Sequence, residues 1–401
     1  MIRLAPALLL ALVACTPPSA NAGGNGIGAA STQSGPPFTA TKQGQFDSPF
    51  AMAFLPDGSL LVTEKAGKLK LRDPSGHIRD VAGVPKVADV EQGGLLGVAL
   101  APDFASSHAL YLTYSENRPN GVGLALARAT LVGTQLQGSN VIWRSGSNGK
   151  GGQFGAVIAF APDGKSLFLS SGERQRFTPA QDINQKLGKI LHLTLDGKPA
   201  PGNPFAQQVG TPTVTVFDPP DNTGAAFKEK GTQQTVEGTN TAPAEIWSMG
   251  HRNPYGLAFD TGGRLWEIEM GPKGGDELNV ILPGKNYGWP KASNGSNYDG
   301  TDIPDHKSGD GFEPPKTFWN PSISPGGLMI YSGDLFPQWK GSAFIAALSG
   351  EALIRVKLDG DKATKADQWP MNTRIRDVVQ GPDGAIWLLQ DDGALMKLTP
   401  R

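Results

Sequence analysis

The stretch GAVIAFAPDGKSLFLSSGE, residues 155–173, decides the fold of this chain. Its first apolar run ends in Ala-Pro-Asp-Gly, and a second apolar run follows at once. In such a turn proline presets φ, the aspartate side chain caps the backbone, and glycine takes the positive φ from which the second strand returns antiparallel. The stretch therefore predicts a β-hairpin.

The same pattern occurs about six times along the chain. The other copies are PFAMAFLPDGSLLVTE from Pro49, GLLGVALAPDFASSHALYLTYSE from Gly94, PYGLAFDTGGRLWEIEMG from Pro254, GLMIYSGDLFPQWKGSAFIAAL from Gly327 and DVVQGPDGAIWLLQDDG from Asp377. A lone hairpin cannot bury both faces, whereas four-stranded sheets packed radially can, and closing the ring protects their edges. We predict an all-β fold, a six-bladed β-propeller with four-stranded antiparallel blades. A β-sandwich is the alternative, but it would not need six similar hairpins.

Composition and spacing set the domain boundaries. The 53 glycines and 33 prolines show no three-residue period, and the 38% hydrophobic content is enough for a core built from short strands. We expect one propeller over residues 41–401. The largest insertion, about residues 206–242, shows no strand pattern and is predicted to form a loop over one face.

The first 40 residues are expected to direct and tether the protein. Residues 1–14, MIRLAPALLLALVA, have one early arginine and an apolar run too short to span a bilayer, which is typical of a secretory signal peptide. Cys15 follows Leu-Val-Ala, a pattern that resembles the bacterial lipobox, although a chance cysteine is the alternative. We expect residues 15–40 to form a lipidated cysteine and a flexible tether, so that the protein is exported to the periplasmic face and membrane-anchored.

The net charge and the cysteine count limit the kinds of ligand and bond that the protein can have. Removal of the signal peptide with Arg3 leaves 35 basic and 37 acidic residues, which gives no indication of a nucleic-acid partner. Since Cys15 is the only cysteine, the rest of the chain can form neither disulfides nor thiolate metal sites.

Polar side chains stand just before several of the predicted hairpins. They are Gln92, Gln153, Arg252 with Asn253, and Arg374 with Arg376. Equal spacing from their strands would bring them to one end of the central channel, where propellers bind ligands. Each could instead satisfy local turn backbone, but three converging guanidinium groups require an anionic ligand or buried carboxylates.

A second group of candidates lies in EMGPKGGDELNVILPGKNYGWP, residues 269–290. Glycine and proline free main-chain carbonyls there, and Glu269, Asp276 and Glu277 add carboxylate oxygens, which are the ligands that calcium prefers. The absence of histidine and cysteine from this stretch argues against zinc or copper. A solvated polar loop is the alternative.

At these residues the chain resembles the soluble, calcium- and pyrroloquinoline quinone (PQQ)-dependent sugar dehydrogenases of the glucose/sorbosone dehydrogenase family, and its bacterial aldose dehydrogenase branch in particular. The resemblance extends from about Gly44 to Pro400 and is carried by QGGLLGVALAPDF, GHRNPYGLAFD, GPKGGDELN with GKNYGWP, and RIRDV followed by GPDG. It implies a six-bladed propeller that oxidises the C1 hydroxyl of aldose sugars to a lactone and passes electrons to an external acceptor.

The resemblance also implies roles for individual residues. It places Gln92, Arg252, Asn253, Arg374 and Arg376 at the PQQ site, with Arg252 also among the catalytic positions. It further implies that the main-chain oxygens of Gly271 and Pro272 hold a calcium ion that polarises the quinone. A second, structural calcium would be bound by Glu277 and the carbonyl of Tyr287.

The chain departs from the family pattern at three positions. The family's general base is a histidine in a Gly-Asn-His-Phe-Gly type of motif, but here the motif is GGQFG and the histidine falls on Gln153. A carboxamide cannot accept a proton near neutral pH, so another base such as Glu173 or a bound water would be needed. Ser349 replaces a cofactor-contacting lysine, and Val157 replaces an arginine.

Three functions are therefore compatible with the sequence. The first is a PQQ-dependent sugar dehydrogenase that acts without the family histidine. The second is a PQQ- or sugar-binding lipoprotein that has lost catalysis. The third is a metal-dependent lactonase-type hydrolase, which is disfavoured because arginines replace the carboxylates that a channel metal would need.

Overall fold

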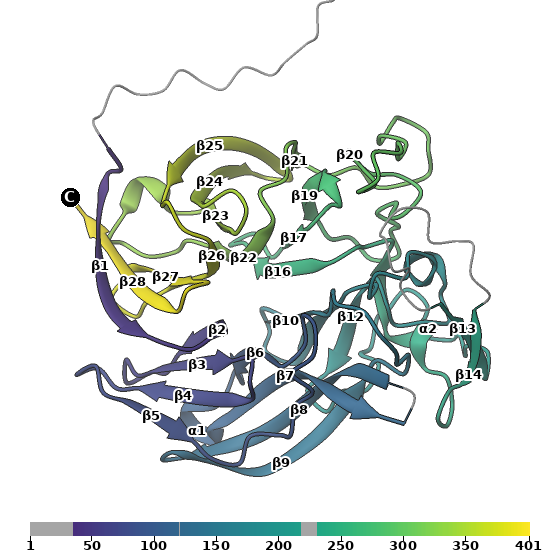
Figure 1. Cartoon of the computed structure of the whole chain (residues 1–401), viewed down its shortest axis with the longest axis horizontal. Coiled ribbons are helices and arrows are strands. Elements are labelled where there is room, and N and C mark those ends of the chain that lie inside the picture. The colour runs from purple at the N-terminus through teal and green to yellow at the C-terminus, as the bar shows by residue number, and fades with distance from the viewer. Residues whose placement is uncertain (1–34, 120, 218–230) are drawn as a thin grey trace, which may run out of the picture. The chain divides into compact units, whose positions relative to one another are not determined.

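Six four-stranded antiparallel sheets form the blades of a β-propeller in the computed structural model, which describes residues 35–119, 121–217 and 231–401 (Figure 1). The predicted fold class is confirmed. The innermost strands β2, β6, β10, β16, β22 and β26 contact one another in this order, and β26 contacts β2 to complete the ring.

The first three blades follow one another along the chain. Blade 1 consists of β2 (Pro49–Phe54), β3 (Leu60–Glu64), β4 (Lys68–Arg72) and β5 (Ile78–Val81). Blade 2 consists of β6 (Leu95–Leu100), β7 (Ala109–Arg118), β8 (Gly121–Val132) and β9 (Gln135–Arg144). Blade 3 consists of β10 (Gly155–Phe160), β11 (Ser166–Ser171), β12 (Lys189–Thr194) and β15 (Ile246–Met249).

The other three blades include the strand that closes the ring. Blade 4 consists of β16 (Pro254–Phe259), β17 (Leu265–Glu269), β19 (Asp276–Val280) and β21 (Thr317–Trp319). Blade 5 consists of β22 (Pro325–Ile330), β23 (Ala343–Ala347), β24 (Ala352–Asp359) and β25 (Lys362–Pro370). Blade 6 consists of β26 (Ile375–Gln380), β27 (Ile386–Gln390), β28 (Ala394–Pro400) and β1 (Phe38–Gln45).

Strand β1 ties the beginning of the described chain to its end. Phe38 pairs with Pro400 and Gln45 with Ala394, so the first strand is the outermost strand of the last blade. Because β1 begins at Phe38, the propeller includes three residues that the sequence analysis assigned to the tether. The predicted signal peptide and the predicted lipidation of Cys15 fall outside the described residues. Within those residues, the helices are all too short or too polar to cross a membrane.

Short elements fill the connections between strands. The helices are α1 (Phe104–Ser107) and α2 (Ala242–Glu245), with 3-10 turns at Thr178–Gln181 and Pro337–Trp339. A small sheet pairs β18 (Lys273–Gly274) with β20 (Gly295–Ser296). Another pairs β13 (Thr213–Val216) with β14 (Thr232–Thr235), which corrects the prediction of a strandless insertion. TVTV alternates threonine with buried valine, but it is only four residues long, and its partner TQQT has no apolar residue, so the pattern was too weak to indicate a hairpin.

The predicted turn chemistry is present in the hairpin of residues 155–173. Asp163 accepts a hydrogen bond of 3.0 Å from the main-chain N–H of Lys165, and Gly164 has a φ of +70°. Strands β3, β17 and β23 are buried along their whole length, because each lies between two neighbouring blades. Six inner hairpins, closed by turns of different lengths, thus produce the ring.

Each innermost hairpin is irregular where its inner strand begins. The pairing register shifts between Pro49 and Met52 in blade 1, and equivalent shifts follow the first residues of β6, β10, β16, β22 and β26. Such bulges release backbone groups from the sheet and are common beside active sites. The candidate polar residues lie at four of these six positions: Gln92 before β6, Gln153 before β10, Arg252 and Asn253 before β16, and Arg374 and Arg376 at the start of β26.

Candidate functional site

A cavity of about 260 Å³ lies where the inner strands begin. Its lining comes from five blades or the loops before them, and consists of Phe50, Lys65, Gln92, Tyr255, Met270, Ser324, Leu348, Arg374 and Arg376. The charged groups among these described residues are all cationic. The cavity therefore combines an apolar wall with positive charge.

Arg374 and Arg376 share a single carboxylate. Arg374 donates from Nε to Asp391 Oδ2 at 2.7 Å, and Arg376 donates from Nη2 to Asp391 Oδ1 at 2.6 Å. Burial raises the pKa of Asp391, but the charge of Arg376 and the hydrogen bonds from both arginines outweigh this, so its pKa lies below its ordinary value. One negative charge neutralises only one of the two guanidinium groups, so a positive charge remains at the cavity wall.

Arg252 does not line this cavity, contrary to the prediction that all the polar residues converge on one site. Its Nη1 donates to the main-chain oxygens of Met270 at 3.0 Å and Gly271 at 2.7 Å. It lies beside a second, much smaller cavity, with Trp289 under the guanidinium group at 5.3 Å. Since Met270 lines both cavities, it separates Arg252 from the larger one.

Asn253 connects blades 3 and 4 and is likewise absent from the lining of the larger cavity. Its Oδ1 accepts a hydrogen bond of 3.2 Å from the main-chain N–H of Gly155, and its Nδ2 contacts Met270 Sδ at 3.8 Å. Asn253 thus fixes the start of β10 and the Met270 side chain.

Gln92 and Gln153 are joined directly. The side-chain Oε1 of Gln92 accepts a hydrogen bond of 2.8 Å from the main-chain N–H of Gln153. The Gln153 side chain is buried, and its own Oε1 accepts from the main-chain N–H of Gln175 at 3.2 Å. With a φ of +54°, Gln153 has the left-handed backbone that turns its loop into β10.

Glu173, the alternative base, is directed into its own loop. Its Oε2 accepts hydrogen bonds from the main-chain N–H groups of Arg176 and Phe177. Burial raises the pKa of Glu173, although the charge of Arg252 and these two hydrogen bonds act in the opposite direction. Glu173 is not part of the cavity lining.

Arg174 holds the loop that carries Gln153, a role that the sequence analysis missed. The buried guanidinium group donates to the main-chain oxygens of Gly151, Gly152, Gly149 and Val122 at 2.7 to 3.3 Å. It also stacks 3.8 Å from the centre of the Phe154 ring. The sequence ERQRF gave no glycine or asparagine signal for the positive φ of Arg174, Gln175 and Phe177. A charged side chain directly after a buried strand was the available clue.

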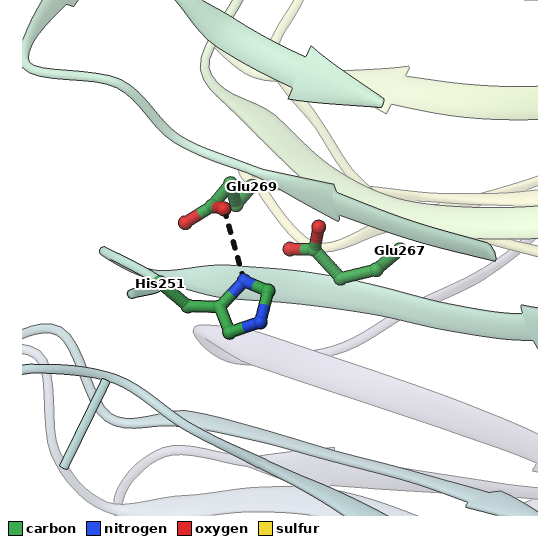
Figure 2. A group of neighbouring side chains, drawn as sticks. All are labelled: His251, Glu267 and Glu269. Carbon is green, nitrogen blue, oxygen red and sulfur yellow. Dashed lines mark hydrogen bonds and ion pairs between the residues drawn. The ribbon is translucent and has the colours of Figure 1, made fainter. Parts of the chain in front are cut away.

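A buried group of acidic side chains lies in blade 4 (Figure 2). Strand pairing sets Glu269 opposite Glu277 and Glu267 opposite Asn279, so all four side chains lie on one face. Ligand atoms of His251, Glu267 and Glu269 lie within 4.8 Å of one another, and His251 Nδ1 is 3.1 Å from Glu269 Oε1. Glu267 was not predicted, because alternation alone did not show whether it was buried.

The charges in this acidic group are incompletely balanced by the described residues. Burial, together with the charge of Glu269, raises the pKa of Glu267 well above its ordinary value. Burial also raises the pKa of Glu277, although His306 lies 3.5 Å away and acts in the opposite direction. Glu267 Oε1 and Asn279 Oδ1 are buried without a hydrogen-bond partner among the described residues. These two oxygens can bind a cation.

The predicted metal ligands fall in different places. Glu277 and Tyr287 line the small cavity together with Gly271, whose oxygen is already bonded to Arg252. Pro272 lines a separate surface hollow. Gly271 and Pro272 thus line different hollows, and the Gly271 oxygen already accepts one hydrogen bond from Arg252.

Asp276, which the sequence analysis predicted as a carboxylate ligand of calcium, accepts hydrogen bonds from within the protein instead. Its Oδ1 accepts from the main-chain N–H of Gly271 at 2.8 Å, and its Oδ2 accepts from three donors in residues 322–324. The carboxylate anchors this loop to β22 of the next blade.

Ser349 is also outside the cavity lining. Its hydroxyl donates to Ser324 Oγ at 2.8 Å, and Ser324 is the residue that reaches the cavity. Val157 is half-buried against an apolar cluster formed by blades 3 and 4. Neither replacement brings a charged group to the cavity.

Comparisons with known proteins agree with this architecture. The family model for glucose/sorbosone dehydrogenase matches residues 46–237 and 227–397. An aldose sugar dehydrogenase from Escherichia coli, YliI, is 37% identical over 90% of this chain and 92% of its own length. Quinoprotein glucose dehydrogenase B from Acinetobacter calcoaceticus is 26% identical over 87% of this chain and 84% of its own.

Solved structures give the same result. The soluble aldose sugar dehydrogenase from Escherichia coli in the apo form has a TM-score of 0.78 at 35% identity, covering 91% of this chain and 100% of that one. The PQQ-bound aldose sugar dehydrogenase from Streptomyces coelicolor has a TM-score of 0.69 at 28% identity, covering 92% and 100%. The chain therefore belongs to the glucose/sorbosone dehydrogenase family.

Proposed function

We propose that this protein is a PQQ- and calcium-dependent dehydrogenase that oxidises the C1 hydroxyl of aldose sugars to a lactone and passes the electrons to an external acceptor. The coarser assignment, a sugar dehydrogenase that acts on a CH–OH group, rests on family membership. The sugar and the acceptor are open.

The observation that carries the cofactor assignment is the cation-lined cavity. Phe50, Tyr255, Met270 and Leu348 offer flat apolar surface to a ring system, and Arg374 and Arg376 have one carboxylate between them. Planar guanidinium groups bind carboxylates in two-pronged fashion, and PQQ is a planar tricarboxylate. The residues present therefore fit PQQ.

The chain's own side chains determine how the sugar hydroxyl is oriented and where its proton goes. A PQQ held by these residues would supply the acceptor for the hydride from C1 of the sugar. The Gln153 amide can orient a sugar hydroxyl or a water by hydrogen bonds but cannot take its proton. Neither Gln153 nor Glu173 is part of the described cavity lining, so we propose that the hydroxyl proton passes to a water molecule in the cavity.

Calcium is better supported at the acidic group than in the channel. The oxygens without partners on Glu267 and Asn279, close to Glu277, favour a bound cation there. The Gly271 oxygen already accepts a hydrogen bond from Arg252, so a calcium ion there would have to use its second lone pair beside a cationic group. No catalytic step is assigned to a calcium ion on Gly271 and Pro272.

Exchange of the arginines tests the cofactor site. We expect Arg374→Ala to weaken PQQ binding by about 10-fold or more, since a charge-assisted hydrogen bond contributes about 1.5 to 3 kcal/mol. Arg252→Ala should also weaken PQQ binding, because Arg252 holds the main chain of Met270, and Met270 lines the cavity. The matched control is Arg264→Ala, which removes another arginine paired with an aspartate, Asp260, outside the cavity lining. Unchanged affinity in both Arg374→Ala and Arg252→Ala would remove the main support for PQQ.

One observation favours a second function, a PQQ- or sugar-binding protein without turnover. Gln153 stands at the position of the family base, and the described cavity lining contains neither histidine nor carboxylate. Bound quinone that no sugar reduces would support this alternative. A lactonase-type hydrolase is disfavoured by the same lining, because it offers a channel metal no carboxylate ligand.

We also propose export to the periplasmic face and lipid anchoring at Cys15. The support is the sequence of residues 1–15 alone. Metabolic labelling with a radioactive fatty acid should mark the wild-type protein and leave Cys15→Ser unlabelled. Equal labelling of both would exclude Cys15 as the anchor.

A further inference from the structure

We propose that Lys65 is a cofactor-binding residue that supplies a third cation to the cavity, at a separate point from the two arginines. This inference rests on the proposed function, since it assigns a second carboxylate-binding point for the same polycarboxylate ligand. Lys65 lies in the turn between β3 and β4 of blade 1 and lines the cavity together with Gln92 and Arg376.

The backbone around Lys65 is fixed between two blades. Its N–H donates to the main-chain oxygen of Ser48 at 3.0 Å, and its own oxygen accepts from the N–H of Leu95 at 3.0 Å. Gly94 packs so closely that a Cβ atom there would lie 2.2 Å from the Lys65 oxygen. The side chain therefore starts from a well-defined point between blades 1 and 2.

The ammonium group has capacity left for a ligand. Lys65 Nζ donates to the main-chain oxygen of Glu91 at 3.2 Å, and among the described residues it forms no ion pair. Lys70, on the next strand, lies within ion-pair distance of both Glu64 and Asp80. An ammonium group has three donors, so two remain available at Lys65.

The distribution of charge indicates the ligand class. Arg374 and Arg376 come from blade 6 and are bridged by Asp391, whereas Lys65 comes from blade 1 and has no carboxylate. A ligand with one carboxylate would use the arginines and leave Lys65 without a partner in a partly apolar cavity. A rigid ligand with two or more separated carboxylates, such as PQQ, satisfies both points.

A lysine at position 349 tests whether PQQ binding requires only a third positive charge or requires that charge at position 65. Ser349 lies beside Ser324, which lines the cavity. A lysine introduced at 349 can extend toward the cavity from blade 5. If the cavity requires a third cation, Ser349→Lys should recover part of the affinity lost at Lys65.

The experiment is a PQQ titration of the full chain, followed by tryptophan fluorescence, with wild type, Lys65→Met, Lys65→Arg and Lys65→Met/Ser349→Lys. The control is Lys68→Met, because Lys68 is an exposed lysine nearby that does not line the cavity. We expect Lys65→Met to bind PQQ about 10- to 100-fold more weakly and Lys68→Met to bind as wild type does. Lys65→Arg and the double variant should recover binding, and the salt dependence of affinity should be shallower in Lys65→Met.

Two outcomes overturn the inference, and they differ in what they say of the proposed function. Wild-type affinity in Lys65→Met, while Arg374→Ala binds weakly, would refute the role of Lys65 and leave the PQQ site intact. Failure of the wild-type protein to bind PQQ would refute both. Thermal unfolding of each variant shows whether weaker binding comes from a loss of fold.

Discussion

The side chain of Gln92 and the backbone of Gln153 form a hydrogen bond of 2.8 Å, from the N–H of Gln153 to Oε1 of Gln92. This bond joins the loops before β6 and β10, so a cavity-lining residue of blade 2 positions Gln153 of blade 3, the residue to which the resemblance assigns the place of a general base. Gly152 leaves room for this contact, since a Cβ atom there would lie 2.5 Å from the Gln92 side chain. The hydrogen bond thus fixes the backbone position of residue 153, although the Gln153 side chain cannot act as a base.

Gln153→His should increase sugar oxidation by about 100-fold, the lower end of what a general base contributes. The bond to Gln92 uses the main chain and should persist in the variant. The measurement is dye-linked oxidation of an aldose at several pH values, where the variant should gain a dependence on a group with a pKa near 6.5.

Gln153→Asn is the control, because it keeps the amide and shortens the side chain. Its rate should stay at or below that of wild type. If Gln153→His gives no increase, another base already operates in this protein, and Glu173→Gln becomes the next variant.

Arg174→Met should lower the free energy of unfolding by about 3 kcal/mol or more. The substitution leaves several buried main-chain oxygens without donors, and each such group costs about 1 to 3 kcal/mol. Urea unfolding measures the loss, and amide hydrogen exchange should show faster exchange in residues 149–153. Arg174→Lys keeps the charge but reaches fewer oxygens, so its loss should be intermediate. Wild-type exchange in Arg174→Met would show that the loop does not depend on this side chain.

Asp391→Asn should be less stable than wild type by about 1 kcal/mol at pH 6, the scale of an ion pair that is partly exposed. Because the pKa of Asp391 is lowered in the folded state, the unfolded protein takes up its proton first as the pH falls. The stabilisation is therefore present above about pH 4 and lost as the pH falls through the folded-state pKa. Urea unfolding of both proteins from pH 6 to pH 3 should show the difference shrinking. A difference that stays constant with pH would contradict the assignment.

Removal of calcium should destabilise the propeller through the acidic group of blade 4. A ligand present at 100 times its Kd stabilises the fold by about 2.7 kcal/mol, so a chelator should lower the Tm and added calcium should restore it. Glu277→Gln should make the Tm insensitive to chelator. The same Tm with and without chelator in the wild-type protein would exclude a structural calcium ion.

The fold could be predicted because its signal is local and repeated. In residues 155–173 the turn residues and the two apolar runs specify one hairpin, and six such hairpins allow few other arrangements. The hairpin of residues 213–216 and 232–235 could not be predicted in this way. Its strands are short and polar, and a long intervening segment separates them.

The candidate site was predicted in part. We predicted cavity residues from their location near the start of an inner strand. This prediction was correct for Gln92, Arg374 and Arg376. It could not distinguish them from Arg252 and Asn253, because the direction of each side chain depends on bulges and on contacts with Met270. Asp391 meets the arginines through the pairing of β26 with β27 within blade 6, which the sequence analysis did not use. Lys65 could not be linked to the site from sequence, since it reaches the cavity from another blade.

The most direct test of the account is to add PQQ and calcium to the purified protein and to follow the absorption of the bound quinone while a panel of aldoses is added. The account predicts that PQQ binds and that at least one aldose reduces it, more slowly than in Gln153→His. Failure of the protein to bind PQQ would contradict the account at its centre, and bound quinone that no sugar reduces would contradict sugar oxidation.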